Sequence, residues 1–302
     1  MKVLVIGGSG FLGSAIVKRL MITGYDVVSY SRNKGLLVEG VDRWIKGDIL
    51  DQIALKKAML GVDLVIHSAD SVKGSSSVIN NSVPGMQNVE GMINLLSVMR
   101  ESSVKRLIFL SSGGTVYGNN NDFLVDEFSA LEPISFYGVQ KVAVEHLLRI
   151  ARIEWDLEYL VIRPSNPYGE GQDGTGAQGL IGVIIRNFLQ KKRTTIFGNG
   201  EIVRDYIYIS DFIDFVVKSL HFNDYCIYNC GSGTGSSVNE VISQVEEAVG
   251  AKILLQYKPS RPHDVQRIVL NCNRAKVNLD WHPRTSLNEG IKKHYKWLKD
   301  NI

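Results

Sequence analysis

The chain has 302 residues, of which 44% are hydrophobic and 22% are charged, and its formal net charge is +3. That length suits one large domain or two modest ones. The apolar fraction is ordinary for a globular protein, which excludes a disordered or fibrous chain. The charge is too small and too evenly spread to indicate a nucleic-acid partner. No apolar run reaches the roughly 18 residues that span a bilayer.

Cysteine usage and the N-terminal residues indicate a reducing compartment. Cys226, Cys230 and Cys272 form neither a CxxC pair nor a disulfide framework. The start, MKVLVIGGSGFLG, turns directly into a folded pattern without a small-residue cleavage site. We therefore expect no signal peptide and a cytoplasmic location. We also expect no metal site, because no His, Cys or carboxylate cluster has the spacing of a ligand set.

Short aliphatic runs alternate with helical patterns through the first half of the chain. Continuous apolar runs are typical of parallel strands, which are buried on both faces. Their alternation with helices predicts a parallel sheet covered by helices on both sides. The predicted strands are residues 3–6, 26–30, 43–46, 63–67, 106–111 and 159–162. The predicted helices are residues 11–22, 52–60, 87–100 and 135–154.

The composition of the sequence changes after Arg163. Residues 164–179 are rich in Pro, Gly, Gln and Asn, which indicates a loop between lobes. The patterns beyond this loop predict helices at 180–190, 211–220 and 287–298 and strands at 195–197, 203–209 and 226–229.

These elements predict an α/β protein of two interleaved parts. A Rossmann-type, doubly wound parallel sheet takes up residues 1–165 and also receives segments from about 203–230. A smaller C-terminal α/β lobe, mainly residues 166–302, binds the substrate.

The sharpest local feature is the run Gly7-Gly8-Ser9-Gly10-Phe11-Leu12-Gly13, placed between the first predicted strand and the first helix. In a dinucleotide fingerprint one glycine makes the tight turn, another lets the backbone approach the pyrophosphate, and the last allows close helix packing. The helix N-terminus then offers unpaired N–H groups to the phosphates. A glycine-rich turn is otherwise only a tight loop, but here position, strand and helix agree.

The end of the second strand bears on the choice between NAD and NADP. It reads Tyr30-Ser31-Arg32-Asn33, without the acid that would bond the adenosine ribose. Arg32 could pair with a 2′-phosphate, or it could be a solvated arginine that stacks on the adenine. The sequence thus leaves both NAD and NADP open. Asp48 is placed to contact the adenine amine, and a structural turn aspartate is the alternative.

Tyr137 and Lys141 lie four residues apart at the start of a long predicted helix, so both side chains share one face. A tyrosine has an ordinary pKa near 10, and a nearby ammonium favours the phenolate. Such a pair can take a proton from a sugar hydroxyl while a hydride leaves the adjacent carbon. This spacing is common by chance, but it follows a dinucleotide turn and a fifth strand that ends in Ser111 and Ser112.

The sequence resembles the extended short-chain dehydrogenase/reductases, in particular the NAD-dependent epimerase/dehydratase family and its UDP-sugar 4-epimerases. The resemblance covers essentially the whole chain. Its carriers are GGSGFLG at 7–13, GDI at 47–49, NVEG at 88–91, SSGGTVYG at 111–118, YGVQK at 137–141, RPSNPYG at 163–169, GNGEIVRDYIYISD at 198–211 and RAKVNLDW at 274–281.

The resemblance implies a role for each matching residue. Tyr137 is the acid/base, and Lys141 holds the nicotinamide ribose. The remaining cofactor residues are Gly7, Gly10, Phe11, Leu12 and Gly13 in the turn, Ser31, Arg32, Asp48 and Ile49 around the adenosine, and Ser68, Ala69, Asn88, Ser111 and Pro164 elsewhere along the cofactor. The substrate residues are Asn166, Arg204 and Arg261 on the diphosphate and Phe197 beside the nucleobase. Arg204 and Arg261 could instead be ion-pair partners.

One position departs from the family pattern. The family places Ser or Thr where this chain has Gly113, so the usual hydroxyl beside the sugar is missing. Ser112 and Thr115 flank the gap, and we expect Thr115 to replace the hydroxyl. Direct contact from Tyr137 or a bridging water are alternatives. The Asp-Glu pair of the sugar dehydratases is also absent, since Gly114 and Thr115 stand there, which argues against a dehydratase.

We therefore expect a nucleotide-sugar 4-epimerase that acts on a nucleotide-diphosphate sugar of the UDP-glucose or UDP-N-acetylglucosamine type, through a transient 4-keto sugar and a tightly bound NAD(P). An NADPH-dependent 4-keto-sugar reductase is the first alternative, and a non-catalytic NADP-binding regulator is the second. Ile268 resembles a position that selects sugar size. The resemblance also favours a homodimer through the helices at 87–100 and 135–154.

Overall fold

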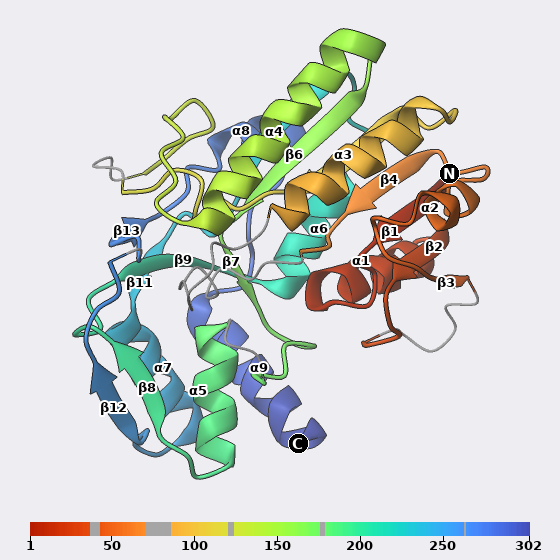
Figure 1. Cartoon of the computed structure of the whole chain (residues 1–302). Helices are drawn as coiled ribbons and strands as arrows, with labels where there is room; N and C mark the ends of the chain where they lie inside the picture. Colours follow the sequence, from red (N-terminus) through yellow and green to blue (C-terminus); the bar gives the residue numbers. More distant parts are fainter. Residues whose placement is uncertain (37–42, 71–85, 120–123, 176–178, 263) are drawn as a thin grey trace. The chain divides into compact units, whose positions relative to one another are not determined.

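The computed structural model divides the chain into two compact units. The residues that it describes are 1–36, 43–70, 86–119, 124–175, 179–262 and 264–302 (Figure 1). Unit 1 comprises Met1–Ser111, Phe136–Arg163 and Val216–Tyr228. Unit 2 comprises Ser112–Ser135, Pro164–Phe215 and Asn229–Ile302.

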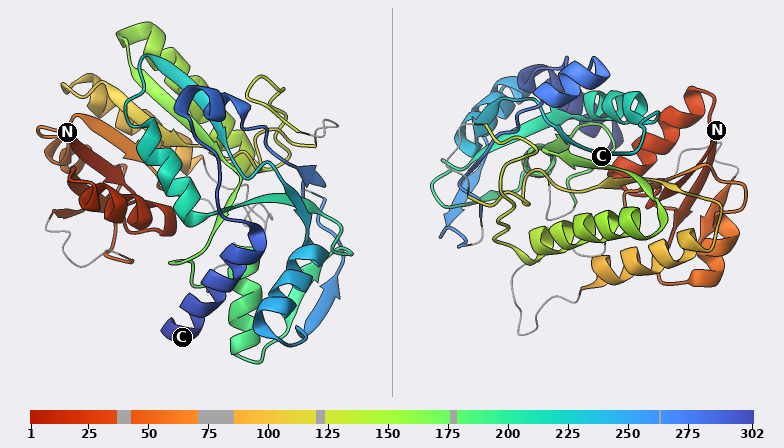
Figure 2. Two further views of the ribbon diagram at one scale, coloured as in Figure 1. Left: turned by 180° about the vertical axis from the view of Figure 1, so that it is seen from behind. Right: turned by 90° about the horizontal axis from the view of Figure 1, so that it is seen from above.

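Unit 1 is built on a parallel sheet. Its elements are β1 (Lys2–Ile6), α1 (Phe11–Ile22), β2 (Asp26–Ser31), β3 (Trp44–Lys46), α2 (Gln52–Ala58), β4 (Leu64–His67), α3 (Gln87–Arg100), β5 (Arg106–Leu110), α4 (Phe136–Trp155), β6 (Glu158–Pro164) and β10 (Tyr225–Cys230). Within the described residues the sheet has seven strands in the order β10-β6-β5-β4-β1-β2-β3. The helices α2, α3 and α4 cover one face of it and α1 lies on the other (Figure 2). The predicted doubly wound parallel sheet is confirmed.

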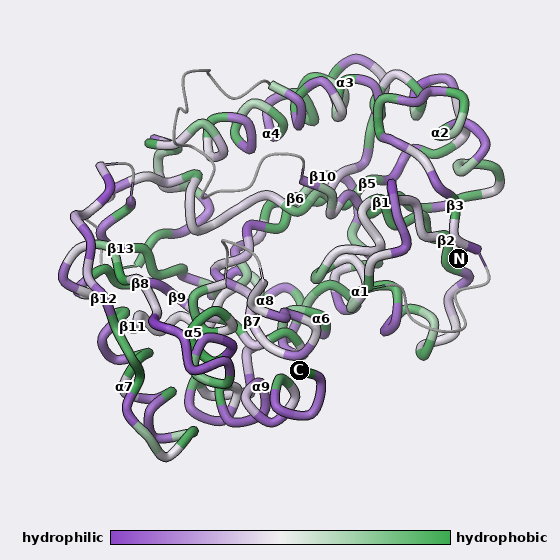
Figure 3. The backbone as a smooth tube through the Cα atoms, turned by 60° about the horizontal axis from the view of Figure 1, so that its bottom comes forward, coloured by the Kyte–Doolittle hydropathy of each residue, from purple (hydrophilic) through white to green (hydrophobic). Residues whose placement is uncertain are grey.

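The buried positions explain why these segments form strands and helices. Val3, Leu4 and Val5 have no exposed surface, as expected for a strand covered on both faces. Along α3 and α4, hydrophobic and hydrophilic residues alternate (Figure 3), and each helix turns its apolar side to the core. The helices α1 and α3 begin and end at the predicted residues, while other predicted elements differ at their ends by up to three residues.

The strand order places a change of direction beside β1. From β1 the chain continues to β2 on one side, while β4 pairs with β1 on the other, with Ile6 opposite His67. In open parallel sheets, ligands bind outside the carboxyl ends of the strands at such a point. The turn after β1 and the residues after β4 are therefore neighbours at the edge where a dinucleotide is expected.

Unit 2 contains shorter elements. They are β7 (Asn166–Tyr168), α5 (Leu180–Leu189), β8 (Thr194–Phe197), β9 (Val203–Tyr208), α6 (Ile209–Ser219), β11 (Gly235–Ser237), α7 (Val238–Val249), β12 (Leu255–Lys258), β13 (Arg267–Ile268), α8 (Asn273–Leu279) and α9 (Leu287–Asn301). The strand β9 pairs with β7, β11 and β13, and β12 pairs with β8. The end of α6 lies in unit 1.

Two segments of the chain differ from the sequence expectation. The predicted loop at 164–179 was wrong for Asn166–Tyr168, because these residues pair in parallel with Tyr206–Tyr208 and this pairing outweighs the local loop composition. Residues 112–135, which we placed with the sheet, group with unit 2, where Val125 forms a bridge to Leu270. None of the helices among the described residues combines the length and hydropathy that crossing a bilayer requires.

Candidate active site

The chain turns tightly after β1, and glycine is required there. Gly7 has a φ of +83°, and a Cβ on it would lie 2.7 Å from the Ala69 backbone nitrogen. The Gly7 amide donates to the Tyr30 carbonyl at 2.8 Å. A Cβ on Gly13 would collide with the Gly7 carbonyl and lie 2.8 Å from the Ser68 hydroxyl. These two glycines therefore let α1 pack closely against the ends of β1 and β4.

Gly10 differs from those two glycines because the fold itself leaves room there. A Cβ on Gly10 would meet the Gly7 carbonyl oxygen at 3.5 Å, an ordinary contact. Gly10 is the N-cap of α1 and contributes no side-chain cap, and Phe11 and Leu12 open the first turn of that helix. The N–H groups of a first turn have no intrahelical acceptor. The start of α1 is thus an open backbone surface that suits an anion.

Of the two residues at the end of β2, Ser31 is hydrogen-bonded within the protein and Arg32 is exposed. The Ser31 hydroxyl donates to the Asn33 carbonyl at 2.8 Å and accepts from Trp44 Nε1 at 2.9 Å. Ser31 is buried, whereas Arg32 is exposed. Arg32 is therefore the side chain of this pair that can reach a ligand.

Asp48 and Ile49 follow β3. Asp48 is exposed, and its Oδ1 accepts from the Leu50 amide at 3.0 Å. The Ile49 carbonyl accepts from Asn94 Nδ2 at 2.6 Å, and its side chain lies against α3, where a Cβ on Gly91 would be 2.8 Å from it. Asp48 Oδ1 thus stabilises the turn, as expected for a structural turn aspartate, while Oδ2 takes no part in this hydrogen bond.

Ser68 and Asn88 make local contacts at the edge of the sheet. The Ser68 amide and hydroxyl both donate to the Ile6 carbonyl at 2.9 Å. Asn88 is buried at the start of α3, and its backbone N–H donates to Gln140 Oε1 at 3.2 Å. The start of α3 is therefore tied to α4, the helix that carries Tyr137 and Lys141.

Tyr137 and Lys141 lie one turn apart on α4, and a carboxylate joins them. Lys141 Nζ is 5.4 Å from the centroid of the Tyr137 ring. It lies 2.8 Å from Asp70 Oδ1, and the Tyr137 hydroxyl donates to Asp70 Oδ2 at 3.1 Å. Desolvation raises the pKa of Asp70, and the charge of Lys141 and the hydrogen bonds from Lys141 and Tyr137 offset part of that rise.

The ammonium of Lys141 is held in a buried setting. Lys141 is 2% exposed, donates to the Leu110 carbonyl at 2.7 Å, and lies 4.7 Å from the centroid of the Phe109 ring. His67, at the end of β4, stacks edge-on against Phe109. Burial, helped by the charge of Lys141, lowers the pKa of His67 to about 3, so this histidine is neutral at physiological pH.

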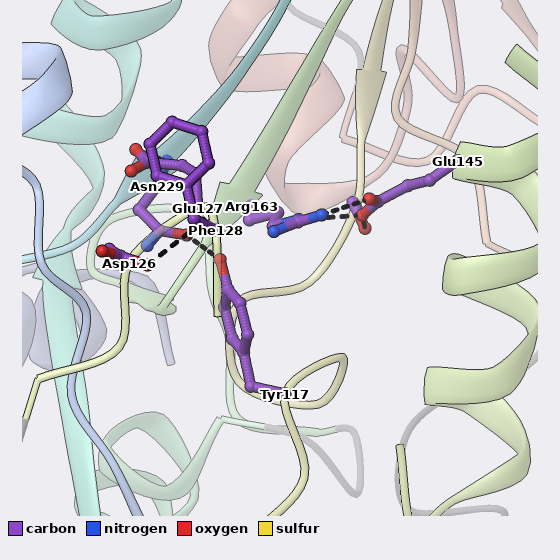
Figure 4. A network of polar contacts seen from close by, with 8 residues as sticks. Tyr117, Asp126, Glu127, Phe128, Glu145, Arg163 and Asn229 are labelled. Atoms are coloured by element: carbon purple, nitrogen blue, oxygen red, sulfur yellow. Dashed lines mark hydrogen bonds and ion pairs between the residues drawn. The ribbon is translucent and has the colours of Figure 1, made fainter. Parts of the chain in front are cut away.

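A second charged pair lies one turn further along α4. Arg163 donates from Nε to Glu145 Oε1 at 3.1 Å and from Nη2 to Oε2 at 2.6 Å (Figure 4). Ser111 also donates to Glu145 Oε1, at 2.5 Å. The side chains of Arg163 and Glu145 are 2% and 6% exposed. The Ser111 hydroxyl is thus bound to a structural carboxylate.

In unit 2 a buried aspartate organises the region around β9. Asp205 Oδ1 accepts from the Ser232 amide and hydroxyl at 2.8 and 2.7 Å, and Oδ2 accepts from the Gly233 amide at 3.1 Å. Burial raises the pKa of Asp205, and these hydrogen bonds offset part of the effect. The Asp205 carbonyl accepts from Asn166 Nδ2 at 2.8 Å. Asp205 is therefore structural, and it fixes the amide group of Asn166.

Two arginines of unit 2 have different settings. Arg204 donates to the Val203 carbonyl at 3.0 Å and pairs with Ile268 in the β9–β13 register, and burial lowers its pKa. Arg261 stacks over Phe197, with its guanidinium carbon 3.5 Å from the ring centroid. The structure thus brings Arg261 and Phe197 together, and it places Arg204 beside Ile268.

The segment with the missing hydroxyl begins unit 2. The Gly113 amide donates to the Pro164 carbonyl at 2.8 Å, and the Thr115 amide donates to the Ser112 carbonyl at 3.2 Å. A Cβ on Gly114 would meet the amide group of Asn166 at 3.9 Å, so the site has room for more atoms. The Thr115 hydroxyl oxygen is buried and has no hydrogen-bond partner among the described residues.

Another tyrosine of this segment is unsuited to proton transfer. Tyr117 is 1% exposed, and its hydroxyl donates to Asn229 Oδ1 at 2.6 Å (Figure 4). The backbone N–H of Asn229 donates to Glu127 Oε1 at 2.8 Å, and burial raises the pKa of that glutamate. Tyr117 is thus enclosed by this network, whereas Tyr137 is half-buried and lies near the ammonium of Lys141.

Comparison with known proteins places this geometry in a family. The model of the NAD dependent epimerase/dehydratase family matches residues 3–231. The chain is 32% identical to a UDP-glucose 4-epimerase of Mycolicibacterium smegmatis over 99% of both chains. It is 31% identical to a dTDP-4-dehydro-6-deoxyglucose reductase of Escherichia coli, over 98% of this chain and 97% of the relative. A UDP-glucose 4-epimerase of Thermus thermophilus, crystallised with NAD, superposes with a TM-score of 0.93 and 29% identity over the full length of both chains.

The chain belongs to the NAD dependent epimerase/dehydratase family. The family implies a dinucleotide, and the residues present fit one. Gly10 leaves open space at the start of α1, and the close contact of Gly7 with Ala69 keeps the turn narrow. An anionic pyrophosphate matches the free first-turn N–H groups in charge and in shape.

Sequence reasoning missed Asp70, Glu145 and Arg163. A signal for Asp70 existed, because an acid three residues beyond a predicted parallel strand lies at the edge where ligands bind. Glu145 lies four residues after Lys141 and so shares its helix face, which is a second usable signal. Nothing local in the sequence pairs Glu145 with Arg163, since that contact joins a helix to the following strand.

Proposed function

We propose that the chain is an NAD-dependent UDP-sugar 4-epimerase. The observation that carries the proposal is the Tyr137–Lys141 pair, held in the same unit as the glycine turn after β1. The full-length similarity to UDP-glucose 4-epimerases supports the same reaction. NAD supplies the redox step, because it can accept a hydride from the sugar and return it.

The residues of unit 1 supply the proton chemistry. Tyr137 takes the proton of the 4-hydroxyl group as the sugar is oxidised, and it returns the proton when the ketone is reduced from the other face. The ammonium of Lys141, 5.4 Å from the Tyr137 ring, favours the phenolate electrostatically. Ser68, Ala69 and Asn88 would line the cofactor along its path from the glycine turn.

The residues of unit 2 would bind the nucleotide part of the substrate. We assign Arg204 and Arg261 to the diphosphate, which two guanidinium groups can bind with charge-assisted hydrogen bonds. Phe197 would lie beside the uracil, and its ring face already accepts the planar guanidinium of Arg261. Asn166, fixed through Asp205, would add a hydrogen bond to the diphosphate.

The sugar would lie beside Gly113 and Gly114. A Cβ on Gly114 would meet Asn166 only at 3.9 Å. We infer that the space beside the two glycines admits a C2 N-acetyl group, so both UDP-glucose and UDP-N-acetylglucosamine are candidate substrates. Thr115, whose buried hydroxyl has no partner among the described residues, would replace the missing hydroxyl group next to Ser112. A Thr115→Val variant should lose turnover that Thr115→Ser keeps, whereas equal rates for the two variants would exclude this role.

At the cofactor, NAD is the proposed occupant, with Pro164 beside the nicotinamide. Arg32 is exposed at the end of β2, where it would meet a 2′-phosphate if NADP were bound. Mass spectrometry of the cofactor released from the purified enzyme, in parallel with an Arg32→Ala variant, decides this. Retention of NADP by the wild type alone would favour NADP.

The reaction is tested by incubating the enzyme with UDP-glucose, UDP-galactose or their N-acetyl counterparts without added cofactor. Interconversion of the 4-epimers at constant nicotinamide absorbance supports the proposal. Turnover that requires stoichiometric NADPH contradicts it and favours a 4-keto-sugar reductase. That alternative is supported by the similarity to the Escherichia coli reductase and by the exposed Arg32.

We further propose a homodimer formed through α3 and α4. Ile93 on α3 and Val139, Ile150 and Ile153 on α4 are exposed apolar residues on two helices that pack together. An Ile153→Glu variant should shift the mass measured by light scattering from dimer to monomer, and an unchanged mass would exclude α4. We also propose a cytoplasmic location, which the three free thiols support.

A further inference from the structure

Asp70 touches both groups of the proposed acid/base pair. Its Oδ1 lies 2.8 Å from Lys141 Nζ, and its Oδ2 accepts the hydrogen bond of the Tyr137 hydroxyl at 3.1 Å. The side chain is 30% exposed, whereas that of Lys141 is 2% exposed. Asp70 thus lies at the open side of a buried cation.

The protons of Lys141 show what Asp70 contributes. An ammonium has three donors. One is directed to the Leu110 carbonyl, one to Asp70, and the charge also faces the Phe109 ring. Among the described residues, Asp70 is the carboxylate in ion-pair distance of Lys141. A buried cation requires a counter-charge, and either the Asp70 carboxylate or the Tyr137 phenolate can provide it.

We propose that Asp70 is a positioning residue that neutralises Lys141, keeps Tyr137 as a phenol, and so sets the pH at which Tyr137 becomes a base. The hydrogen bond from the Tyr137 hydroxyl to Asp70 also favours the protonated phenol, because a phenolate has no proton to donate. This inference rests on the proposed function for its catalytic consequence, and on the contacts of Asp70 for its physical basis.

The other groups that face the pair do not replace Asp70. His67 approaches Lys141 from β4, but burial lowers its pKa to about 3, so it carries no charge over the working range. From β5, Phe109 and Leu110 contribute a ring face and a carbonyl, neither of which titrates. Tyr137 and Lys141 also face each other, with Nζ 5.4 Å from the centroid of the Tyr137 ring.

The test is a pH titration of the holoenzyme and its Asp70→Asn variant, which keeps the size of the side chain and removes the charge. The pH midpoint of kcat/KM for UDP-glucose should fall by about one unit or more, because a charge within hydrogen-bond distance shifts a titration by that amount. One unit below the wild-type midpoint, the variant should then reach about fivefold more of its plateau rate than the wild type. Asp70→Glu, which restores the charge, should return the midpoint toward the wild-type value.

A second readout does not depend on activity. Phenolate formation is followed by near-ultraviolet difference absorbance, and subtracting the matching Tyr137→Phe protein isolates the signal of Tyr137. This midpoint should also move to lower pH in Asp70→Asn. Asp63→Asn is the matched control, since Asp63 is an exposed acid of the same unit that binds the Lys2 amide at 2.7 Å.

Unchanged midpoints in folded Asp70→Asn would overturn the inference, as would an equal shift in Asp63→Asn. If Asp70→Asn does not fold, Asp70→Ser is titrated against the same two predictions. A wild-type enzyme that converts no UDP-sugar would contradict the proposed function, while the phenolate titration would still decide the role of Asp70.

Discussion

Lys141 and Glu145 lie on the same face of α4, and each forms a charged pair with a residue outside the helix, but the two pairs have different surroundings. Glu145 and Arg163 are joined by two hydrogen bonds, Ser111 supplies a third, and both side chains are nearly inaccessible. Lys141 and Asp70 share a single contact, and Asp70 is partly open to solvent. The pairs have the same kinds of charge and are separated by one helical turn.

The two charged pairs differ in their number of hydrogen bonds and in their exposure to solvent. Glu145 accepts two hydrogen bonds from Arg163 and one from Ser111, and the side chains of Glu145 and Arg163 are nearly inaccessible, so this pair fixes α4 on the sheet. Lys141 and Asp70 share one contact, and the Asp70 side chain is 30% exposed, so solvent reaches this pair on the Asp70 side. We call Glu145–Arg163 the closed pair and Lys141–Asp70 the open pair. The buried, multiply bonded closed pair suits a structural role, and the open pair, which solvent reaches, suits proton transfer.

The largest expected effect comes from removing the cation of the open pair. Lys141→Met keeps most of the buried aliphatic volume but removes the charge beside Tyr137. Epimerisation should fall by about 10²–10⁴-fold, the usual contribution of general acid–base catalysis. The free energy of unfolding should change less than in an Arg163→Met variant, because the carboxylate left unpaired, Asp70, is 30% exposed, whereas Glu145 is 6% exposed. Initial rates and urea unfolding of the same preparation check both statements, and a variant with normal rates would contradict them.

Removing the cation of the closed pair should have the opposite profile. Arg163→Met leaves Glu145 buried without a counter-charge, so the free energy of unfolding should fall by about 3–5 kcal/mol. Adding Glu145→Gln to this variant removes the unpaired charge and should recover part of the loss. Urea unfolding measures both proteins. Equal destabilisation of the single and double variants would show that Glu145 is not the source of the effect.

Buried neutral histidines provide a third kind of site, in which pairing is replaced by loss of charge. His294 on α9 contacts the Gln172 carbonyl at 2.8 Å, and burial lowers its pKa to about 4. Between the ordinary pKa near 6.5 and about 4, the unfolded chain binds a proton that the folded chain does not. Stability contributed by His294 is therefore present above that window and is lost as the pH falls through it, to a total of about 3 kcal/mol.

A His294→Gln variant isolates this contribution. Its free energy of unfolding should fall less than that of the wild type between pH 7 and pH 4, because other titrating groups are common to both proteins. Urea unfolding at a series of pH values gives the two slopes. Parallel slopes would mean that the pKa of His294 is the same in the folded and unfolded chain, which would contradict the prediction.

The sequence predicted most of the fold because the signals for a parallel sheet are local. The unbroken apolar run at Val3–Ile6 and the periodic helix at Gln87–Arg100 need no information from elsewhere. The strand Asn166–Tyr168 was missed because its only reason to be a strand is its partner, Tyr206–Tyr208, about 40 residues away.

The candidate site divides in the same way. Gly7 and Gly13 follow from a spacing that the backbone itself requires, and the shared face of Tyr137 and Lys141 follows from helix periodicity. Asp70 reaches that pair only because β4 and β5 are adjacent in the sheet, and no periodicity reports this adjacency.

The smallest expected effect belongs to an ion pair on the surface of unit 1. It has the same N···O distance as the Arg163–Glu145 pair but a much larger exposure, so it separates the effect of burial from that of distance. Lys56 Nζ lies 2.6 Å from Glu101 Oε2, as close as the Arg163–Glu145 contact, but the two side chains are 50% and 60% exposed. Water and salt screen such a pair, so a double-mutant cycle with Lys56→Ala and Glu101→Ala should give a coupling below about 1 kcal/mol. Added salt should reduce it further. A coupling as large as that between Arg163 and Glu145 would mean that short distance, and not burial, makes the pair on α4 structural.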